Sequence, residues 1–207
     1  MSGKLFTFDA LHCQKKTLEI IQATGNDALI QVKRNQPTLF DTLSGWAQSV
    51  PAEQTHCTSD MGRRNRHESR VATVWPLQAA VTEKLPEWPG LAWLVRIERS
   101  TDVFNMADNT WKNRKETAWH ICTRMLSAEQ ANACVRKHWA IENSLHYVRD
   151  VTLGEDASRI RKQPGTFARL RSWALNLIRF KGFQSIHAAR QSLGWDPQAA
   201  WDSLSVA

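Results

Sequence analysis

Residues 138–150 read HWAIENSLHYVRD, from His138 to Asp150, within a stretch that has the periodicity of an α-helix. This helix is expected to begin at Ser127, because Ser127 and Gln130 have the spacing of a capping box. Four apolar residues at helical spacing would share one buried arc: Cys134, Ile141, Leu145 and Val148.

A neighbouring strip of the same helix carries four ionisable side chains, and the sequence predicts that it is partly buried. They are His138, Glu142, His146 and Arg149, at positions i, i+4, i+8 and i+11. Burying such groups is costly unless they pair or bind a ligand. Periodicity alone leaves two interpretations open: a ladder of salt bridges on the helix surface, or a functional site around Glu142.

Composition limits the classes of protein to consider. The chain has 207 residues, 42% of them hydrophobic and 23% charged, which is ordinary for a globular protein with a real core. Its formal net charge of +7 favours a polyanionic partner, nucleic acid first. The four cysteines lack Cys-x-x-Cys spacing, which argues against a zinc knuckle or a disulfide scaffold. With no signal peptide or membrane-spanning run, a cytoplasmic location is expected.

The first 32 residues predict a β-α-β unit. Strands are expected over residues 4–9 and 28–32, joined by a helix over residues 10–23, which implies parallel strands. Asp9 would then lie at the carboxyl end of its strand, where open α/β sheets bind ligands. The alternative role for Asp9 is a helix N-cap, and the residues alone favour the cap.

The next segment predicts a loop, a helix and an antiparallel sheet. Lys33 and Asn35 follow the second strand, at the sheet edge of Asp9, although spacing alone favours a plain polar connector. Pro37 suits the first turn of a helix through residue 48. Residues 50–60 are expected to form a loop. Strands are expected over residues 66–75, 92–97 and 116–122, with a turn at residues 108–109.

Charged residues and a last helix follow Asp150. Glu155 and Asp156 are expected to have structural roles, such as caps or salt bridges to Arg159. Arg159, Arg161 and Lys162 form a basic cluster that agrees with the overall charge. A helix is expected over residues 165–179, and its predicted buried face comprises Phe167, Leu170, Trp173, Ala174 and Leu177.

Five short motifs occur in an order and spacing that resemble one known family. They are DALHCQK at 9–15, KRNQPTL at 33–39, HWAIENSLH at 138–146, DVT at 150–152 and EDASRIR at 155–161. Together they resemble the DDE transposases of bacterial insertion sequences known as H-repeat-associated proteins. The resemblance covers roughly residues 5–180, and the joint spacing of the motifs makes it specific.

The resemblance implies an α/β fold: a ribonuclease-H-like catalytic core with an inserted antiparallel β region. The expected divisions are a partial core at 1–48, the β-rich insertion at 49–125, core helices at 126–185 and a tail at 186–207. Asp9 and Glu142 match the family's catalytic, metal-binding carboxylates, which would hold two Mg²⁺ ions about 4 Å apart for phosphoryl transfer on DNA.

The resemblance also implies supporting residues and partners. His138, His146 and Arg149 match positions expected to orient Glu142 or to contact phosphate. Lys33 and Asn35 match a family motif at the active-site edge that is expected to touch the DNA backbone. Arg66 and Arg70 match a basic-acidic-basic strand, and with Arg159, Arg161 and Lys162 they are the expected DNA-binding residues. The expected partners are double-stranded DNA (insertion-sequence ends and target DNA) and further copies of the chain, in a nucleoid-associated protein without membrane contact.

Two departures from the family shape the functional expectation. Arg64-Asn65 stands where the family commonly has His-Gly, and no acidic residue precedes Asp9 to serve as the first catalytic Asp. The sequence therefore predicts an N-terminally truncated transposase core whose strand cleavage and strand transfer are impaired. The alternative is a non-catalytic DNA-binding remnant or the product of a pseudogene.

Overall fold

The computed structural model describes residues 2–62, 66–88 and 90–204. The chain divides into two compact units, Met1–His138 and Trp139–Ala207, called here the N-terminal and the C-terminal unit. Each unit is described by itself. Arg64 and Asn65, which depart from the family pattern, lie outside the described residues.

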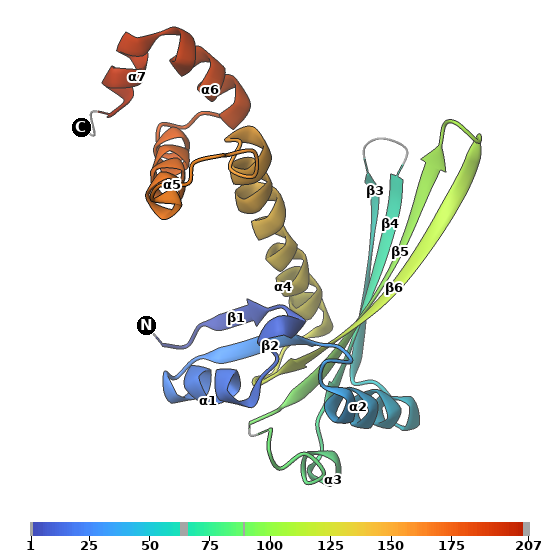
Figure 1. The fold of residues 1–207 in the computed structure, drawn as a ribbon. Coiled ribbons are helices and arrows are strands. Elements are labelled where there is room, and N and C mark those ends of the chain that lie inside the picture. The colour runs from blue at the N-terminus through green and yellow to red at the C-terminus, as the bar shows by residue number, and fades with distance from the viewer. Residues whose placement is uncertain (1, 63–65, 89, 205–207) are drawn as a thin grey trace. The chain divides into compact units, whose positions relative to one another are not determined.

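The N-terminal unit is built on one mixed six-stranded sheet of order β1-β2-β6-β5-β4-β3 (Figure 1). Its strands are β1 Leu5–Phe8, β2 Asp27–Val32, β3 Gln54–Gly62, β4 Arg66–Pro76, β5 Trp93–Asn105 and β6 Thr110–Cys122. Strands β1 and β2 pair in parallel, and all other pairs are antiparallel. The expected mixed α/β class is therefore confirmed. The expected division into domains stays a prediction.

The predicted β-α-β start is confirmed, and its crossover contains two short helices. A 3₁₀ turn, η1 Ala10–His12, follows β1 and leads into helix α1 Lys15–Ala23. Gly25 closes the crossover at φ +70°, a left-handed conformation that glycine adopts without strain. The chain then enters β2, and parallel pairing places the carboxyl ends of β1 and β2 at the same edge of the sheet.

The antiparallel strands are longer than predicted, and one expected loop is a strand. The prediction of a loop over residues 50–60 holds only up to residue 53 and is wrong from Gln54 onward, because β3 runs along the edge of the sheet and pairs with β4 over its whole length. An edge strand pairs on one side only, so it can keep the polar composition that suggested a loop. The predicted turn at 108–109 is confirmed, with Asn109 at φ +51°. Pairing of β6 with β2 makes the antiparallel strands continuous with β1 and β2.

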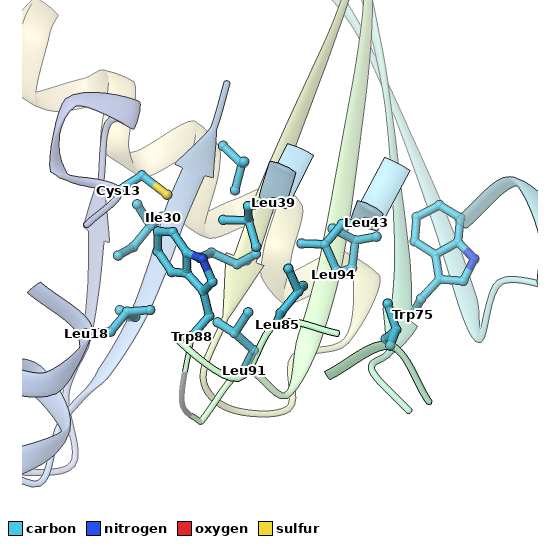
Figure 2. Close-up of a cluster of buried hydrophobic side chains, with 14 of the residues drawn as sticks. Cys13, Leu18, Ile30, Leu39, Leu43, Trp75, Leu85, Trp88, Leu91 and Leu94 are labelled. Carbon is cyan, nitrogen blue, oxygen red and sulfur yellow. The ribbon is translucent and has the colours of Figure 1, made fainter. Parts of the chain in front are cut away.

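One face of the sheet is covered by three helices: α1, α2 Pro37–Ser49 and α3 Ala79–Thr82 (Figure 1). Their apolar residues meet those of the central strands in one core, part of which is shown in Figure 2. Leu18 of α1, Leu43 of α2 and Leu94 of β5 are at most 2% exposed. Each fully buried leucine stabilises the fold by roughly 1.5–3 kcal/mol through removal of apolar surface from water.

The opposite face carries a second core under helix α4 Ala128–Ile141. Ala131 and Val135 of α4 pack with Leu29, Val95 and other strand residues. The predicted capping box is confirmed: the Gln130 amide donates to Ser127 Oγ at 3.1 Å, and the Ser127 amide donates to Gln130 Oε1 at 3.1 Å. The box fixes where the helix begins, and therefore which of its residues face the sheet.

The C-terminal unit is helical, and its first turns are wider than predicted. Segments η2 Glu142–His146 and η3 Val148–Thr152 have π-helical hydrogen bonding, and α5 Pro164–Phe180, α6 Ile186–Trp195 and α7 Pro197–Leu204 follow. A π turn closes i to i+5, so the residues predicted to align at i+4 no longer share one strip. Accordingly, Glu142 and His146 are exposed, and so is Ile141 of the predicted apolar arc.

The predicted buried face of α5 is also wrong at three positions. Phe167, Leu170 and Trp173 are exposed, whereas Leu175 and Ile178 are buried. Periodicity places residues on a common side of the helix, but the neighbours in the unit determine which side is covered.

Among the described residues, no helix is long and apolar enough to cross a membrane.

Candidate active site

Asp9 directly follows β1, and its side chain is engaged away from the helix it precedes. The residue occupies the N-cap position of η1, but its side chain makes no capping hydrogen bond. Instead, Asp9 Oδ1 lies 3.2 Å from Nε2 of His138 in α4. The side chain of Asp9 is 62% exposed. The capping role that the residues alone favoured is therefore wrong, and the carboxylate is open to a ligand.

His138 connects Asp9 to the strand before it. Nδ1 of His138 lies 2.9 Å from the Thr7 hydroxyl, while Nε2 faces Asp9. Thr7 and Asp9 are two residues apart, so an extended chain places them on the same side of the sheet. His138 lies near the carboxyl end of α4, over the face that Thr7 and Asp9 share.

The loop that carries Asp9 is held by the loop after β2. Asn35 Nδ2 donates to the Ala10 carbonyl at 2.7 Å, and Gln36 Nε2 donates to the Cys13 carbonyl at 2.9 Å. These bonds join the two loops at the carboxyl ends of the parallel strands. Asn35 thus acts on the backbone beside Asp9, while Lys33 in the same loop is exposed.

Sequence reasoning missed a histidine at this edge of the sheet. His120 of β6 is 6% exposed, and its buried Nδ1 has no hydrogen-bond partner among the described residues. Burial lowers the pKa of His120 to about 4, and the electrostatic influence of His138 and Lys33 adds to this lowering, whereas that of Asp9 opposes it. His120 is therefore neutral at pH 7. A polar residue between the apolar Trp119 and Ile121 was the available signal.

The fit of a divalent cation can be tested on these residues. Carboxylate oxygens are the ligands that Mg²⁺ prefers, and the exposed Asp9 side chain supplies one such group. Within the described part of the chain, however, no three His, Cys, Asp or Glu residues gather into a metal-binding cluster. Asp9 thus fits one ligand position, and the N-terminal unit alone does not form a full coordination shell.

In the C-terminal unit, Glu142 opens the π-helical segment η2 and its side chain is exposed. π turns within helices are often found at functional sites. Arg149 in η3 makes two hydrogen bonds to Glu155, of 2.9 and 2.7 Å. This pairing corrects the expected salt bridge between Glu155 and Arg159. His146 is exposed, and so are the residues of the basic cluster, Arg159, Arg161 and Lys162, and the neighbouring Asp156.

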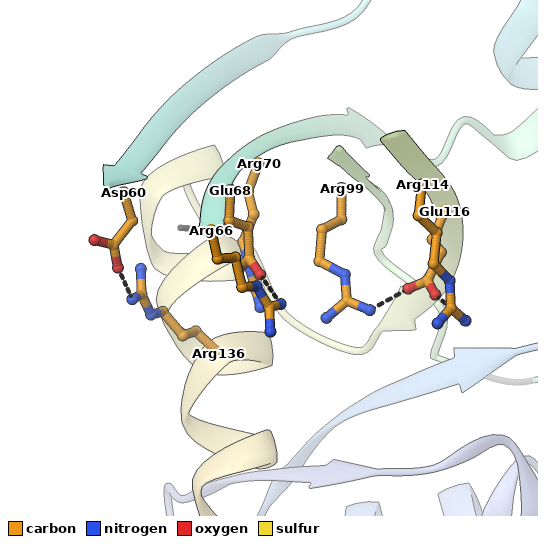
Figure 3. A network of polar contacts seen from close by, with 8 residues as sticks. All are labelled: Asp60, Arg66, Glu68, Arg70, Arg99, Arg114, Glu116 and Arg136. Carbon is orange, nitrogen blue, oxygen red and sulfur yellow. Dashed lines mark hydrogen bonds and ion pairs between the residues drawn. The ribbon is translucent and has the colours of Figure 1, made fainter. Parts of the chain in front are cut away.

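The basic-acidic-basic strand forms a polar network across the sheet (Figure 3). Glu68 of β4 lies between Arg66 and Arg70 and accepts a hydrogen bond of 2.6 Å from each. Glu116 of β6 accepts from Arg99 of β5 and pairs with Arg114, while Asp60 of β3 accepts from Arg136 of α4. Arg70 is only 8% exposed, whereas the Arg66 side chain is 46% exposed. Of the two predicted DNA-binding arginines, Arg66 is thus the accessible one.

Comparison with known proteins places these residues in context. Residues 2–178 match the family model described as the transposase DDE domain. The putative protein YbfL and the H repeat-associated putative transposase YhhI, both from Escherichia coli strain K12, are each 28% identical over 86% of this chain and 48% of their own length. The putative transposase YncI of E. coli O157:H7 is 28% identical over 86% of this chain and 46% of its own. The chain spans about half the length of the curated relatives it matches.

Proposed function

The chain belongs to the transposase DDE domain family, and from this premise we propose that it contributes two catalytic carboxylates, Asp9 and Glu142, to metal-dependent DNA transposition. The reaction would be strand cleavage and strand transfer at insertion-sequence ends, on a ribonuclease-H-like core. Double-stranded DNA would be the partner, bound by a homo-oligomer in the nucleoid.

One observation supports the proposal most directly: Asp9 presents an open carboxylate at the carboxyl end of a parallel strand, where α/β sheets bind ligands. The assignment of Glu142 rests on its matched motif. The family uses a divalent metal, and in the proposed site two Mg²⁺ ions, held by Asp9 and Glu142, would activate the attacking oxygen and stabilise the leaving oxygen. The residues around Asp9 would hold its carboxylate in place.

The other matched residues are given supporting roles in this proposal. Lys33 and Asn35 lie in the loop beside Asp9, where Asn35 holds the backbone and the exposed Lys33 would contact a phosphate group. His146 and the basic cluster at Arg159, Arg161 and Lys162 are exposed and would contact the DNA backbone. Arg149 pairs with Glu155, so its role would be to hold the chain after Glu142.

The test measures Mn²⁺-dependent nicking of supercoiled plasmid DNA by the purified chain. The chain is expected to nick slowly, and Asp9→Asn and Glu142→Gln should each lower that rate to the level seen in EDTA, because each removes a charged metal ligand. Glu129→Gln, in the first turn of α4, is the matched control and should leave the rate within twofold. Nicking that survives both ligand substitutions, or persists in EDTA, would contradict the proposal.

A second candidate function is DNA binding without catalysis. Two observations favour it: the net charge of +7, and the lack of a three-ligand metal cluster in the described part of the chain. This candidate predicts salt-dependent binding of duplex DNA that Glu142→Gln leaves unchanged, with no nicking in Mg²⁺ or Mn²⁺. A fluorescence-anisotropy titration over a range of salt concentrations distinguishes it from the first candidate.

A further inference from the structure

The imidazole of His138 bridges two groups on the strand that leads to Asp9. It lies 2.9 Å from the Thr7 hydroxyl through Nδ1 and 3.2 Å from Asp9 Oδ1 through Nε2. The side chain of His138 is only 23% exposed, whereas that of Asp9 is 62% exposed. The more buried partner is therefore the histidine, which is held by its helix and by Thr7.

The chemistry of the three groups fixes their hydrogen-bond roles. An ionised carboxylate only accepts hydrogen bonds, so Nε2 of His138 carries the proton that is donated to Asp9. In the neutral imidazole, Nδ1 is then the acceptor, and the Thr7 hydroxyl donates to it. Asp9 thus selects the tautomer, and the Thr7 hydroxyl, which can donate or accept, is free to donate to Nδ1 in that tautomer.

The pairing of β1, β2 and β6 places uncharged side chains beside the His138–Asp9 contact. Thr7 pairs with Leu29, and Leu29 pairs with Cys122, so one row of residues runs across β1, β2 and β6. Two residues further along β2, Gln31 pairs with His120 of β6, just as Asp9 lies two residues beyond Thr7. His120 is buried there in its neutral form and adds no positive charge that would compete with His138 for Asp9.

We propose that His138 is the positioning residue of Asp9: it acts through a hydrogen bond to Oδ1 and leaves Oδ2 to a divalent cation. The inference rests on the proposed function, in which Asp9 is a metal ligand. It assigns His138 to the carboxylate rather than to a DNA phosphate. Hydrogen-bond partners of metal ligands commonly contribute about 10- to 100-fold to metal affinity.

The test is a Mn²⁺ titration of the ¹⁵N-labelled chain, followed by the paramagnetic broadening of the Asp9 backbone amide resonance. His138→Gln and His138→Asn form a matched pair. The Gln side chain carries an N–H donor near the position of Nε2, whereas Asn reaches only the position of Nδ1. We expect His138→Asn to require about tenfold more Mn²⁺ than the parent chain, and His138→Gln to stay within about twofold of it.

Two further variants keep the result interpretable. Thr7→Val removes the hydroxyl with little change in shape, and it should require severalfold more Mn²⁺ even if His138→Asn unfolds the chain. In an Asp9→Asn background, His138→Asn should have no further effect, because its action passes through the carboxylate. Circular dichroism melts establish that each variant is folded.

The outcomes separate the two proposals. If Asp9→Asn leaves the broadening unchanged, Asp9 binds no cation, and both the proposed function and this inference are overturned. If Asp9→Asn abolishes the broadening but neither His138→Asn nor Thr7→Val weakens it, only the inference is overturned. If His138→Gln and His138→Asn weaken Mn²⁺ binding equally, the inference is also overturned. A role of His138 in packing alone would not depend on whether the amide N–H reaches the position of Nε2.

Discussion

Glu68 and Arg70 are joined on β4 by a hydrogen bond of 2.6 Å from Arg70 Nε to Glu68 Oε1. Arg70 is 8% exposed, so its positive charge is largely removed from water. Burial alone would raise the pKa of the Glu68 carboxyl, but the hydrogen bonds and charges of Arg70 and Arg66 outweigh it and lower the pKa below 4.5. The pair therefore contributes to stability as long as Glu68 is ionised.

Glu68→Gln is expected to lower the free energy of unfolding by about 2 kcal/mol at pH 7, because it leaves Arg70 buried without its counter-charge. Since the folded-state pKa of Glu68 is lowered, the difference between parent and variant should shrink as the pH falls below 4.5. Urea denaturation at several pH values measures both effects. Glu98→Gln is the control: the Glu98 side chain is 44% exposed, and its pairing with Arg96 should contribute less than about 1 kcal/mol.

A second pH dependence of the free energy of unfolding is expected from the burial of His120. Its pKa falls from 6.5 to about 4 on folding, so the unfolded chain binds an extra proton between these values. Stability is thus fully present above pH 6.5 and is lost as the pH falls towards 4. At pH 5 the loss should be about 2 kcal/mol relative to pH 7.5.

His120→Gln provides the measurement, because glutamine does not titrate in this range. Urea denaturation of parent and variant at pH 5 and pH 7.5 should show a smaller loss of stability in the variant on acidification. His187→Gln, in the C-terminal unit, serves as the matched control and should retain the loss of the parent. Identical pH dependence in the parent and His120→Gln would show that His120 is not held neutral.

The sequence predicted the order of elements well where local pattern determines structure. The β-α-β start, the helix at Pro37 and the capping box at Ser127 follow from short-range rules, and each is present. Asp9 could be placed at a strand end for the same reason. Its engagement with His138 could not, because the two residues are 129 positions apart and are brought together by packing of α4 on the sheet.

The errors share one physical cause: burial depends on neighbours that periodicity does not specify. β3 is polar because it lies at the edge of the sheet, and only its register with β4 identifies it as a strand. Phe167 and Leu170 lie at helical spacing, yet α5 is buried at Leu175 and Ile178. The π turns after Ile141 likewise shift Glu142 and Arg149 away from the alignment that an α-helix would give.

The capping box at Ser127 makes a third prediction, on helix stability. Ser127→Ala removes the oxygen that accepts from the Gln130 amide, and it should lower the free energy of unfolding by about 1 kcal/mol. Urea denaturation measures the change. Ser49→Ala is the control, since Ser49 lies in the last turn of α2 and donates to the Trp46 carbonyl rather than capping the start of a helix. Equal effects of the two substitutions would argue against a specific capping contribution.

The last prediction concerns Asn35 and the local opening of the backbone beside Asp9. Its side chain donates to the Ala10 carbonyl at 2.7 Å and so ties the η1 turn to the loop after β2. Asn35→Ala removes that hydrogen bond, worth about 1 kcal/mol, so local opening of residues 9–14 should become roughly fivefold more frequent. Hydrogen exchange followed by mass spectrometry measures this directly and needs neither metal nor DNA.

The matched control is Asn113→Ala, which removes hydrogen bonds to Ser100 and Asp102 in the β5–β6 hairpin and should leave exchange at residues 9–14 unchanged. Unaltered exchange in Asn35→Ala would mean that the loop is held by Gln36 and its own backbone, and Asn35 would then be left as a surface residue of the DNA-facing loop in the proposed function.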